Sequence, residues 1–292
     1  MSIFIFVLGL IFGSFGSVLI TRLSSNKFDK KEIKSVVLGF SHCPKCKKRL
    51  KPQNLFPLLS YIIQNGKCDN CSQKISPFYF IIELLSGLVF LLTYLLFPHP
   101  NYFILGFRLF TNRILLLIMI YDFMEYELHI PVLIFGLFVS LLPQFLNIIG
   151  DYHIAFWGSV GLFITFLAIY YLSKLYVKYR YKQNFEGIGF GDVILAFFIG
   201  TLFPFIFQFN NLIFNIFNLI QLILIYVLIS SIIGIIIRAI KLLIKHSSYG
   251  LKNITKHLNI PGQHIIPFLP AMIITYRILL FNTSFILKFL LP

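Results

Sequence analysis

Eight long apolar segments constrain the fold of this chain more than any other feature. They lie at about 3–21, 78–97, 103–121, 130–149, 154–174, 193–209, 212–237 and 263–290. Each is close to the roughly 20 residues that a helix needs to cross a bilayer. Of the 292 residues, 58% are hydrophobic and only 12% are charged, which is more apolar surface than a soluble core of this size requires. We therefore expect an all-α polytopic membrane protein with about eight transmembrane helices.

The positions of lysine and arginine predict how these helices are oriented. With the N-terminus outside, the basic loops at 22–77, 122–129, 175–192 and 238–262 all face one side. The opposite links, at about 98–102, 150–153 and 210–211, contain neither residue. Basic loops mark the cytoplasmic side. The net charge of +15 therefore indicates a membrane partner and no nucleic-acid partner.

The first apolar segment is expected to stay in the mature chain. No basic residue precedes it and no A-x-A-like cleavage site follows it, so it lacks the features of a cleaved signal peptide.

Two aspartates lie where apolar segments meet polar loops. Asp122 follows the run at 114–121, and Asp192 closes the run Gly189-Phe190-Gly191-Asp192 before the segment at 193–209. The predicted topology places both at the cytoplasmic face. A carboxylate near hydrocarbon costs about 2.5–3.5 kcal/mol, so such residues usually do chemistry, carry ions or pair with a partner.

This pair is suited to peptide hydrolysis. Two carboxyl groups held close share one proton, so one can activate a water while the other polarises a carbonyl. Gly189 and Gly191 would let a substrate backbone approach. The pattern favours an aspartyl protease at a membrane face.

Other interpretations of these acids stay open. Asp192 could be a helix N-cap and Asp122 an interfacial acid. Glu125 and Glu127 are nearby and could be mistaken for the partner. A different class, an ion-coupled transporter or channel with a zinc-folded cytoplasmic loop, would also use membrane acids. The chain offers few polar residues midway through its helices for an ion path.

Four cysteines form two C-x-x-C pairs in the basic loop. Cys43 and Cys46 are separated by 21 residues from Cys68 and Cys71. In a reducing cytosolic loop this spacing favours structural zinc over disulfides. Metal could supply the folding energy that so small a loop lacks. The alternative is four unpaired cysteines or two redox pairs.

Taken in order, the motifs resemble those of the type IV prepilin peptidase family, GxGD-type membrane aspartyl proteases that are also N-methyltransferases. The similar segments are Gly13–Val18 with Arg22-Leu23, Cys43–Cys46, Asn54–Tyr61, Gly66–Cys71, Glu83–Gly87, Asp122, Gly187–Asp192 and Ile266–Pro270. They follow the family order across nearly the whole chain.

The resemblance implies the chemistry in detail. Asp122 and Asp192 match the catalytic aspartates, with Gly189 and Gly191 in support. The enzyme would cleave the leader of prepilin or pseudopilin precursors at the cytoplasmic face of the bacterial inner membrane. It would then methylate the new N-terminal residue with S-adenosyl-L-methionine. Glu83 is a candidate for methyl transfer or for orienting the new amino terminus; alternatively it neutralises Arg108 or Arg113.

Departures from the family pattern bear mainly on methyl transfer. Ser17, Ile194 and Leu269 replace residues typical of the family, and the family's tryptophan after the first cysteine pair is absent. The amino-terminal changes bear on methyl transfer, so a peptidase without methyl transfer is the alternative function. We expect three regions: a first transmembrane helix at 1–21, a four-cysteine, methyltransferase-associated module at 22–77, and a peptidase region at 78–292. The sequence leaves open the particular pilin, the oligomeric state, and a role in adhesion, type II secretion or competence.

Overall fold

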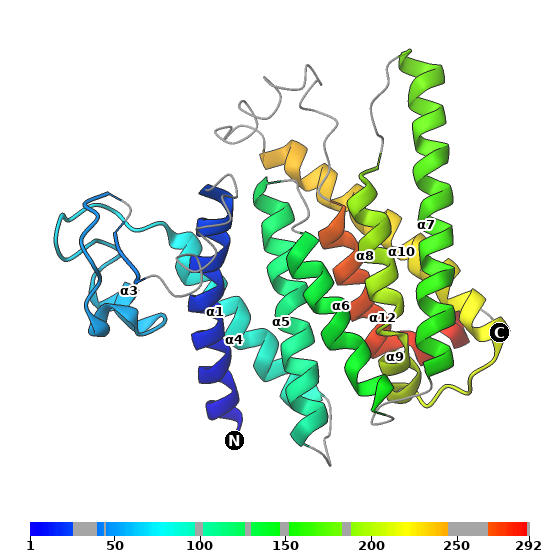
Figure 1. Cartoon of the computed structure of the whole chain (residues 1–292), viewed down its shortest axis with the longest axis horizontal. Coiled ribbons are helices and arrows are strands. Elements are labelled where there is room, and N and C mark those ends of the chain that lie inside the picture. Colours follow the sequence, from blue (N-terminus) through cyan, green and yellow to red (C-terminus); the bar gives the residue numbers. More distant parts are fainter. Residues whose placement is uncertain are drawn as a thin grey trace. The chain divides into compact units, whose positions relative to one another are not determined.

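The computed structural model describes residues 1–25, 40–43, 45–96, 102–125, 130–146, 152–182, 188–244 and 268–290. These residues form helices and no strand, apart from two isolated β-bridges. The chain divides into two compact units, Met1–Leu117 and Ile118–Pro292 (Figure 1). Glu127, Gly187, Ile266 and Pro267 lie outside the described residues.

Close packing of two helices forms the membrane part of the first unit. Helix α1 (Ser2–Ser25) lies against α4 (Pro77–Leu96). Small residues allow this approach, because a Cβ at Gly13 would lie 2.7 Å from the Cα of Glu83. In lipid, helices associate through such close backbone contacts. The start of α5 (Tyr102–Glu125) adds Leu105 and Leu109 to an apolar cluster that includes Ile5 and Phe90.

The four-cysteine module, residues 40–76, belongs to the same unit. It contains a 3-10 helix η1 (Pro52–Leu55) and a single turn α3 (Leu59–Ile63). Two antiparallel bridges, His42 to Arg49 and Lys67 to Lys74, close one loop around each C-x-x-C pair. The module has little apolar interior: of its described residues, only the two cysteines Cys43 and Cys68 are buried.

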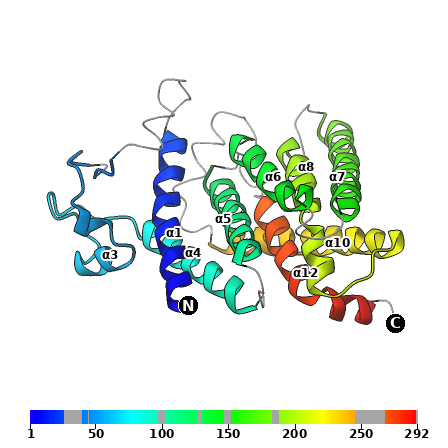
Figure 2. The ribbon, with the colours of Figure 1, turned by 60° about the horizontal axis from the view of Figure 1, so that its bottom comes forward.

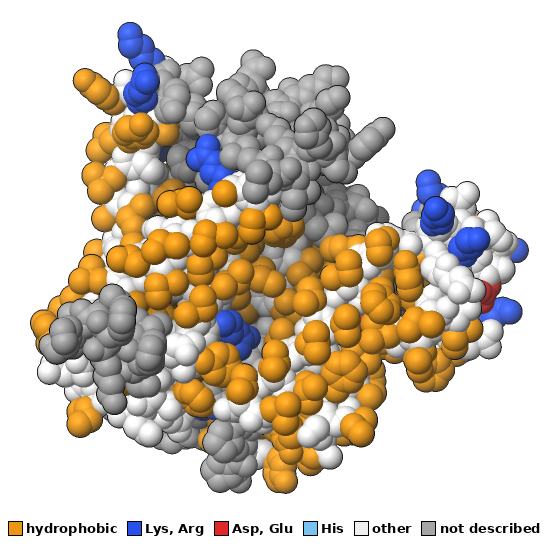
Figure 3. Space-filling view, turned by 180° about the vertical axis from the view of Figure 1, so that it is seen from behind, with side chains coloured by type: hydrophobic (Ala, Val, Ile, Leu, Met, Phe, Trp, Pro, Cys, Tyr) orange, Lys and Arg blue, Asp and Glu red, His pale blue; other side chains and the backbone are white. Residues whose placement is uncertain are grey.

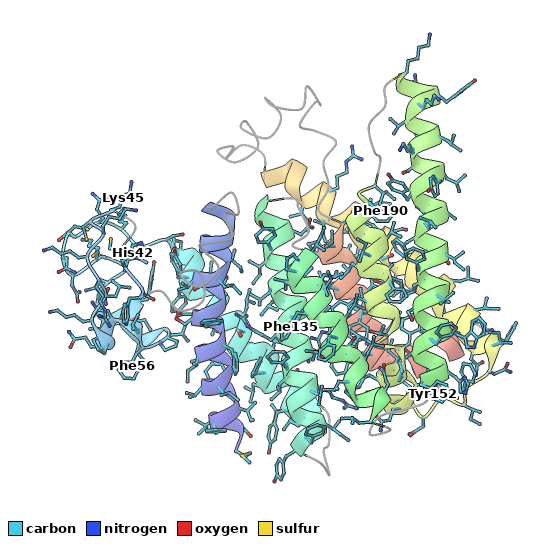
Figure 4. All side chains as sticks on the ribbon, viewed as in Figure 1. His42, Lys45, Phe56, Phe135, Tyr152 and Phe190 are labelled. Carbon is cyan, nitrogen blue, oxygen red and sulfur yellow. The ribbon has the colours of Figure 1, made fainter. Side chains whose placement is uncertain are left out.

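The second unit is a helical bundle. It contains α6 (Ile130–Phe145), α7 (Tyr152–Tyr181), α8 (Phe190–Gly200), α9 (Phe203–Phe209), α10 (Ile216–Ile244) and α12 (Leu269–Leu290). Helix α7 packs on α8, and α10 packs on α12 (Figures 1 and 2). Tyr152 and Phe190, the first residues of α7 and α8, lie at opposite ends of the bundle (Figure 4), so these two helices run antiparallel.

The lengths of the described helices confirm a polytopic membrane protein. Five are long and apolar enough to span a bilayer, namely Ser2–Ile20, Pro77–Leu96, Tyr102–Phe123, Tyr152–Arg180 and Ile216–Ile240. The pair α8 and α9, bent by 40°, makes a sixth if it counts as one span. Two shorter apolar helices, Ile130–Gln144 and Leu269–Thr283, complete the eight segments expected from the sequence. Apolar side chains cover most of the visible helix surface (Figure 3).

A polar contact stabilises the bend between α8 and α9. Thr201 follows α8, and Pro204 lies in the first turn of α9, where its missing N–H costs nothing. The Ser140 and Thr201 hydroxyls lie 2.8 Å apart, and Gln144 Nε2 donates to the Thr201 carbonyl at 2.8 Å. Gln144 thus satisfies a backbone carbonyl at the bend, as burial in lipid requires.

Candidate functional site

Asp192 lies in the first turn of α8. Gly189 is the N-cap, in extended conformation, and the Asp192 N–H donates to the Gly189 carbonyl at 3.1 Å. The alternative that Asp192 is the N-cap is therefore wrong. The N-terminal end of a helix favours negative charge, so α8 offers this acid a favourable dipole.

Asp122 and Asp192 come together within the second unit. Asp122 lies in the last turn of α5 and is 3% exposed, and Asp192 is 5% exposed. Their carboxyl groups are close enough for their charges to interact. The Asp192 Oδ1 atom is buried without a hydrogen-bond partner in the described part of the chain. The structure thus brings together two buried acids that lie 70 residues apart in the sequence.

An apolar wall adjoins Asp192. Tyr226 of α10 is fully buried, lies within reach of the Asp192 charge, and donates its hydroxyl to the Met272 carbonyl at 3.0 Å. Its ring meets Phe166 and Phe203. The sequence analysis missed Tyr226, because one tyrosine in an apolar helix gives no motif. Its burial shows that the α10 side of this region is apolar and closed to water.

Two glycines lie in the turn that leads to Asp192. Gly189 is exposed, and a Cβ there would lie 3.8 Å from the Asp192 Oδ2 atom. Gly191 is partly exposed in the same turn. Both glycines predicted to support the site therefore lie beside the acid, although their role stays a prediction. Glu125 and Glu127 have no described side chain.

The four cysteines form one cluster that could hold zinc. Their sulfur atoms all lie within 4.8 Å of one another, and Cys43 Sγ is 3.9 Å from Cys71 Sγ. A tetrahedral site with Zn–S bonds of about 2.3 Å needs sulfurs roughly 3.8 Å apart. The Cys46 backbone N–H, together with bonds from Lys45 and the neighbouring thiols, lowers the pKa of the Cys43 thiol to about 7. Desolvation and the other thiols of the cluster raise the pKa of Cys71 to about 11, so the four sulfurs share their protons unequally.

Equivalent turns present the two cysteine pairs. The Lys47 N–H donates to the Cys43 carbonyl at 2.9 Å, and the Ser72 N–H donates to the Cys68 carbonyl at 2.8 Å. Lys47 and Ser72 both have positive φ, at 58° and 55°. Such repeated strain needs support from the surroundings, and a bound metal would provide it.

Glu83 contacts the cysteine module. It is 8% exposed, and its Oε2 accepts the Leu58 N–H at 2.8 Å. The Ser14 hydroxyl of α1 also bonds the carboxyl group. Leu58 has φ of 59°, so the carboxylate holds a strained backbone position. These contacts join α1, α4 and the module at one point.

Arg113 has other neighbours. Its Nη1 donates to Ser86 Oγ at 3.5 Å, and its guanidinium occupies the space where Gly16 lacks a side chain. In the described part of the chain, Glu83 and Arg113 form no ion pair with each other. The structure therefore does not support the alternative in which Glu83 neutralises Arg113. The alternative that Glu83 neutralises Arg108 and the functional role of Glu83 both stay predictions.

These features define a helical, polytopic membrane protein with a buried pair of aspartates and a four-cysteine module. Residues 7–97 match the model of the bacterial peptidase A24 N-terminal domain. Two prepilin leader peptidase/N-methyltransferases cover most of the chain. The Klebsiella pneumoniae protein is 28% identical over 202 residues, 68% of this chain and 83% of that relative. The Pseudomonas aeruginosa protein is 24% identical over 261 residues, 84% and 82% of the two chains.

A third relative is more similar over a shorter stretch. The prepilin leader peptidase/N-methyltransferase of Vibrio cholerae is 40% identical over 79 residues, 27% of this chain and 31% of that relative. No solved structure matches the chain. Together, the domain model and these relatives support the resemblance of the chain to the type IV prepilin peptidase family.

Proposed function

We propose that this protein is a membrane aspartyl peptidase that removes the leader peptide of type IV pilin-like precursors. The observation that best supports this function is the buried pair Asp122 and Asp192, whose charges interact across two helix ends. The names of the relatives support the same substrate class. A precursor with a basic leader followed by an apolar segment would lie across the membrane surface with the scissile bond near these helix ends.

The acid pair would divide the chemistry of hydrolysis. Like charges held close disfavour double ionisation, so one carboxyl group keeps its proton. The ionised group takes a proton from water as the water oxygen bonds the scissile carbonyl carbon. The protonated group gives its proton to the carbonyl oxygen. When the carbon–nitrogen bond breaks, the leaving amine takes a proton from the pair, and one hydroxyl of the tetrahedral intermediate gives a proton back as it becomes the new carboxyl group. The pair therefore returns to its starting state with one proton.

The surroundings of Asp192 suit this reaction. Tyr226 and its aromatic neighbours keep bulk water from one side, which strengthens electrostatic interactions in the site. Gly189 leaves space for an extended substrate backbone on the other side. Since the basic loops predict that these helix ends face the cytoplasm, we place cleavage at the cytoplasmic face of the bacterial inner membrane.

Methyl transfer would follow at the first unit. Four relatives carry N-methyltransferase in their names at 24–28% identity over more than half of this chain. We propose that the neutral terminal amine would take the methyl group as its bond to the sulfonium of S-adenosyl-L-methionine breaks, leaving S-adenosylhomocysteine, and that the methylated ammonium would then lose a proton. Glu83 is buried and acidic, so its charge could orient that amine or favour the sulfonium of the donor.

Zinc would have a structural role in the same unit. Cys43, Cys46, Cys68 and Cys71 would hold it with four sulfurs, which leaves no open position for substrate. The metal would fix the loops that present Leu58 to Glu83.

Cleavage of a precursor by the purified protein tests this function. The protein is reconstituted in vesicles and given a pilin precursor peptide, with and without S-adenosyl-L-methionine, and the products are weighed by mass spectrometry. We expect a shortened peptide in both reactions and one added methyl group only with the donor. A shortened peptide that gains no methyl group in either reaction would show that the protein is a peptidase without methyl transfer. A precursor that stays intact with correctly folded protein would exclude the proposed function.

A further inference from the structure

One end of the cysteine module exposes large apolar side chains. Five of the nine residues from 55 to 63 are apolar and between 45% and 77% exposed, namely Leu55, Phe56, Leu59, Ile62 and Ile63. They lie on η1 and α3 and the link between them. We call this set the apolar tip. An exposed apolar patch of this size on a small polar module is typical of a surface that contacts another protein, a ligand or a membrane.

The opposite end of the module is basic. Lys45 lies there and is exposed, and the neighbouring Lys47, Lys48 and Arg49 are exposed as well. Phe56 lies at one end of the module and Lys45 and His42 at the other (Figure 4). In the space-filling view the lower end of the module is apolar and the upper end carries lysine and arginine (Figure 3). Apolar and cationic groups at opposite ends are typical of segments that lie in a membrane interface.

Hydrogen bonding fixes the depth of the apolar tip. Leu58, in the middle of this segment, donates its N–H to Glu83. Glu83 is six residues after Pro77, about 9 Å into α4 at 1.5 Å per residue. The Glu83 backbone also packs on Gly13, inside the span Ser2–Ile20. The tip is therefore held beside the interior of two membrane spans rather than beyond their ends.

We propose that the apolar tip is inserted in the bilayer that the spans cross, while the basic end binds the anionic headgroups of that leaflet. An apolar surface at the depth of hydrocarbon gains free energy from lipid contact. Lysine and arginine at the surface are attracted to anionic lipid. The module is then an interfacial element of the membrane domain and not a free cytoplasmic loop. Its position would hold the zinc-binding sulfurs at the membrane surface.

Tryptophan fluorescence tests the depth of the tip. The chain has one tryptophan, Trp157, which Trp157→Phe removes. In that background, Phe56→Trp reports on the tip and Lys45→Trp on the basic end. Each protein is reconstituted in vesicles of phosphatidylethanolamine and phosphatidylglycerol, with or without brominated acyl chains. Zinc content and thermal melting confirm that each variant is folded.

We expect Phe56→Trp to emit at shorter wavelength than Lys45→Trp and to lose most of its fluorescence to brominated lipid. Lys45→Trp should respond to aqueous iodide instead. Native Trp157, which is 48% exposed on a membrane-length helix, is the reference for lipid contact. Quenching of Phe56→Trp by iodide would overturn the proposal, because the tip would face water. Quenching by neither reagent would also overturn it, because protein would then cover the tip.

Discussion

At the scale of single residues, the pair Asp122 and Asp192 shows why burial matters more than motif. Each acid lies at a helix end, a position that many ordinary surface acids share. What distinguishes them is that both are at least 95% buried and that their charges interact. Buried acids so close together are unfavourable unless a proton is shared, and that is the property that hydrolysis needs.

Replacing either acid by its amide should abolish cleavage. Asp122→Asn and Asp192→Asn keep the shape of the side chain but cannot hold or pass the shared proton. We expect the rate to fall by at least roughly 10²–10⁴-fold, the range for losing general acid–base catalysis. The protein should still insert and accumulate, which immunoblotting of membranes would check beside a precursor cleavage assay. Glu125→Gln and Glu127→Gln are the controls and should have much smaller effects. Substantial cleavage by either aspartate variant would show that other residues form the active site.

Glu83→Gln should reduce methylation and leave cleavage largely intact. The amide still accepts the Leu58 N–H but removes the negative charge. Protein abundance, cleavage and N-methylation are measured together. Ser86→Ala, one turn further along α4, is the matched control for packing against α1. Equal loss of all three measurements in Glu83→Gln would count against a functional charge and favour a purely structural one.

At the scale of elements, close contacts between helices depend on glycines. These glycines have ordinary helical backbone angles, and they are needed because a side chain would not fit between the helices. Gly200 ends α8 where it crosses α7, and a Cβ there would lie 2.3 Å from the Ser159 Cα and 2.5 Å from the Gly158 carbonyl oxygen. Backbone cannot move aside as a flexible side chain can. The position of α8, and with it that of Asp192, therefore depends on this crossing.

Gly200→Ala should destabilise the protein, because α7 and α8 must separate to admit the methyl group. We expect a loss of about 1–3 kcal/mol, the range for overpacking, measured as a lower unfolding midpoint in detergent. Gly106→Ala is the matched control, since a Cβ at Gly106 in α5 meets nothing within 4 Å. That variant should be neutral or slightly stabilised. Similar melting of the two variants would contradict the close crossing.

The cysteine module should bind about one zinc ion per chain. Replacing both Cys43 and Cys68 by serine breaks the site at its two buried sulfurs and should remove the metal. Because the site is structural, the loop should become protease-sensitive before cleavage of the precursor fails. Metal analysis and limited proteolysis of the purified protein measure this. Wild-type protein with no zinc and with four thiols that react with DTNB would disprove the metal site.

At the scale of the whole molecule, two units divide the groups of the proposed chemistry. Glu83 and the cysteine cluster lie in Met1–Leu117, and both aspartates lie in Ile118–Pro292. Helix α5 belongs to both, since it contributes Leu105 to the first unit and Asp122 to the second. The functional division expected from the sequence, at 21 and at 77, stays a prediction. The structural division at Leu117 falls within a helix, where no change of composition marks it.

The sequence by itself determined the class of the protein, because the period and length of apolar segments are local properties that fix helices in a bilayer. It also predicted the four-cysteine cluster, since two C-x-x-C pairs at this spacing are typical of zinc sites. The 40° bend at Thr201, the wall at Tyr226 and the bond from Leu58 to Glu83 appear only in the tertiary structure. Each joins residues from different elements, and in a chain of near-uniform apolar helices no local pattern specifies which faces meet.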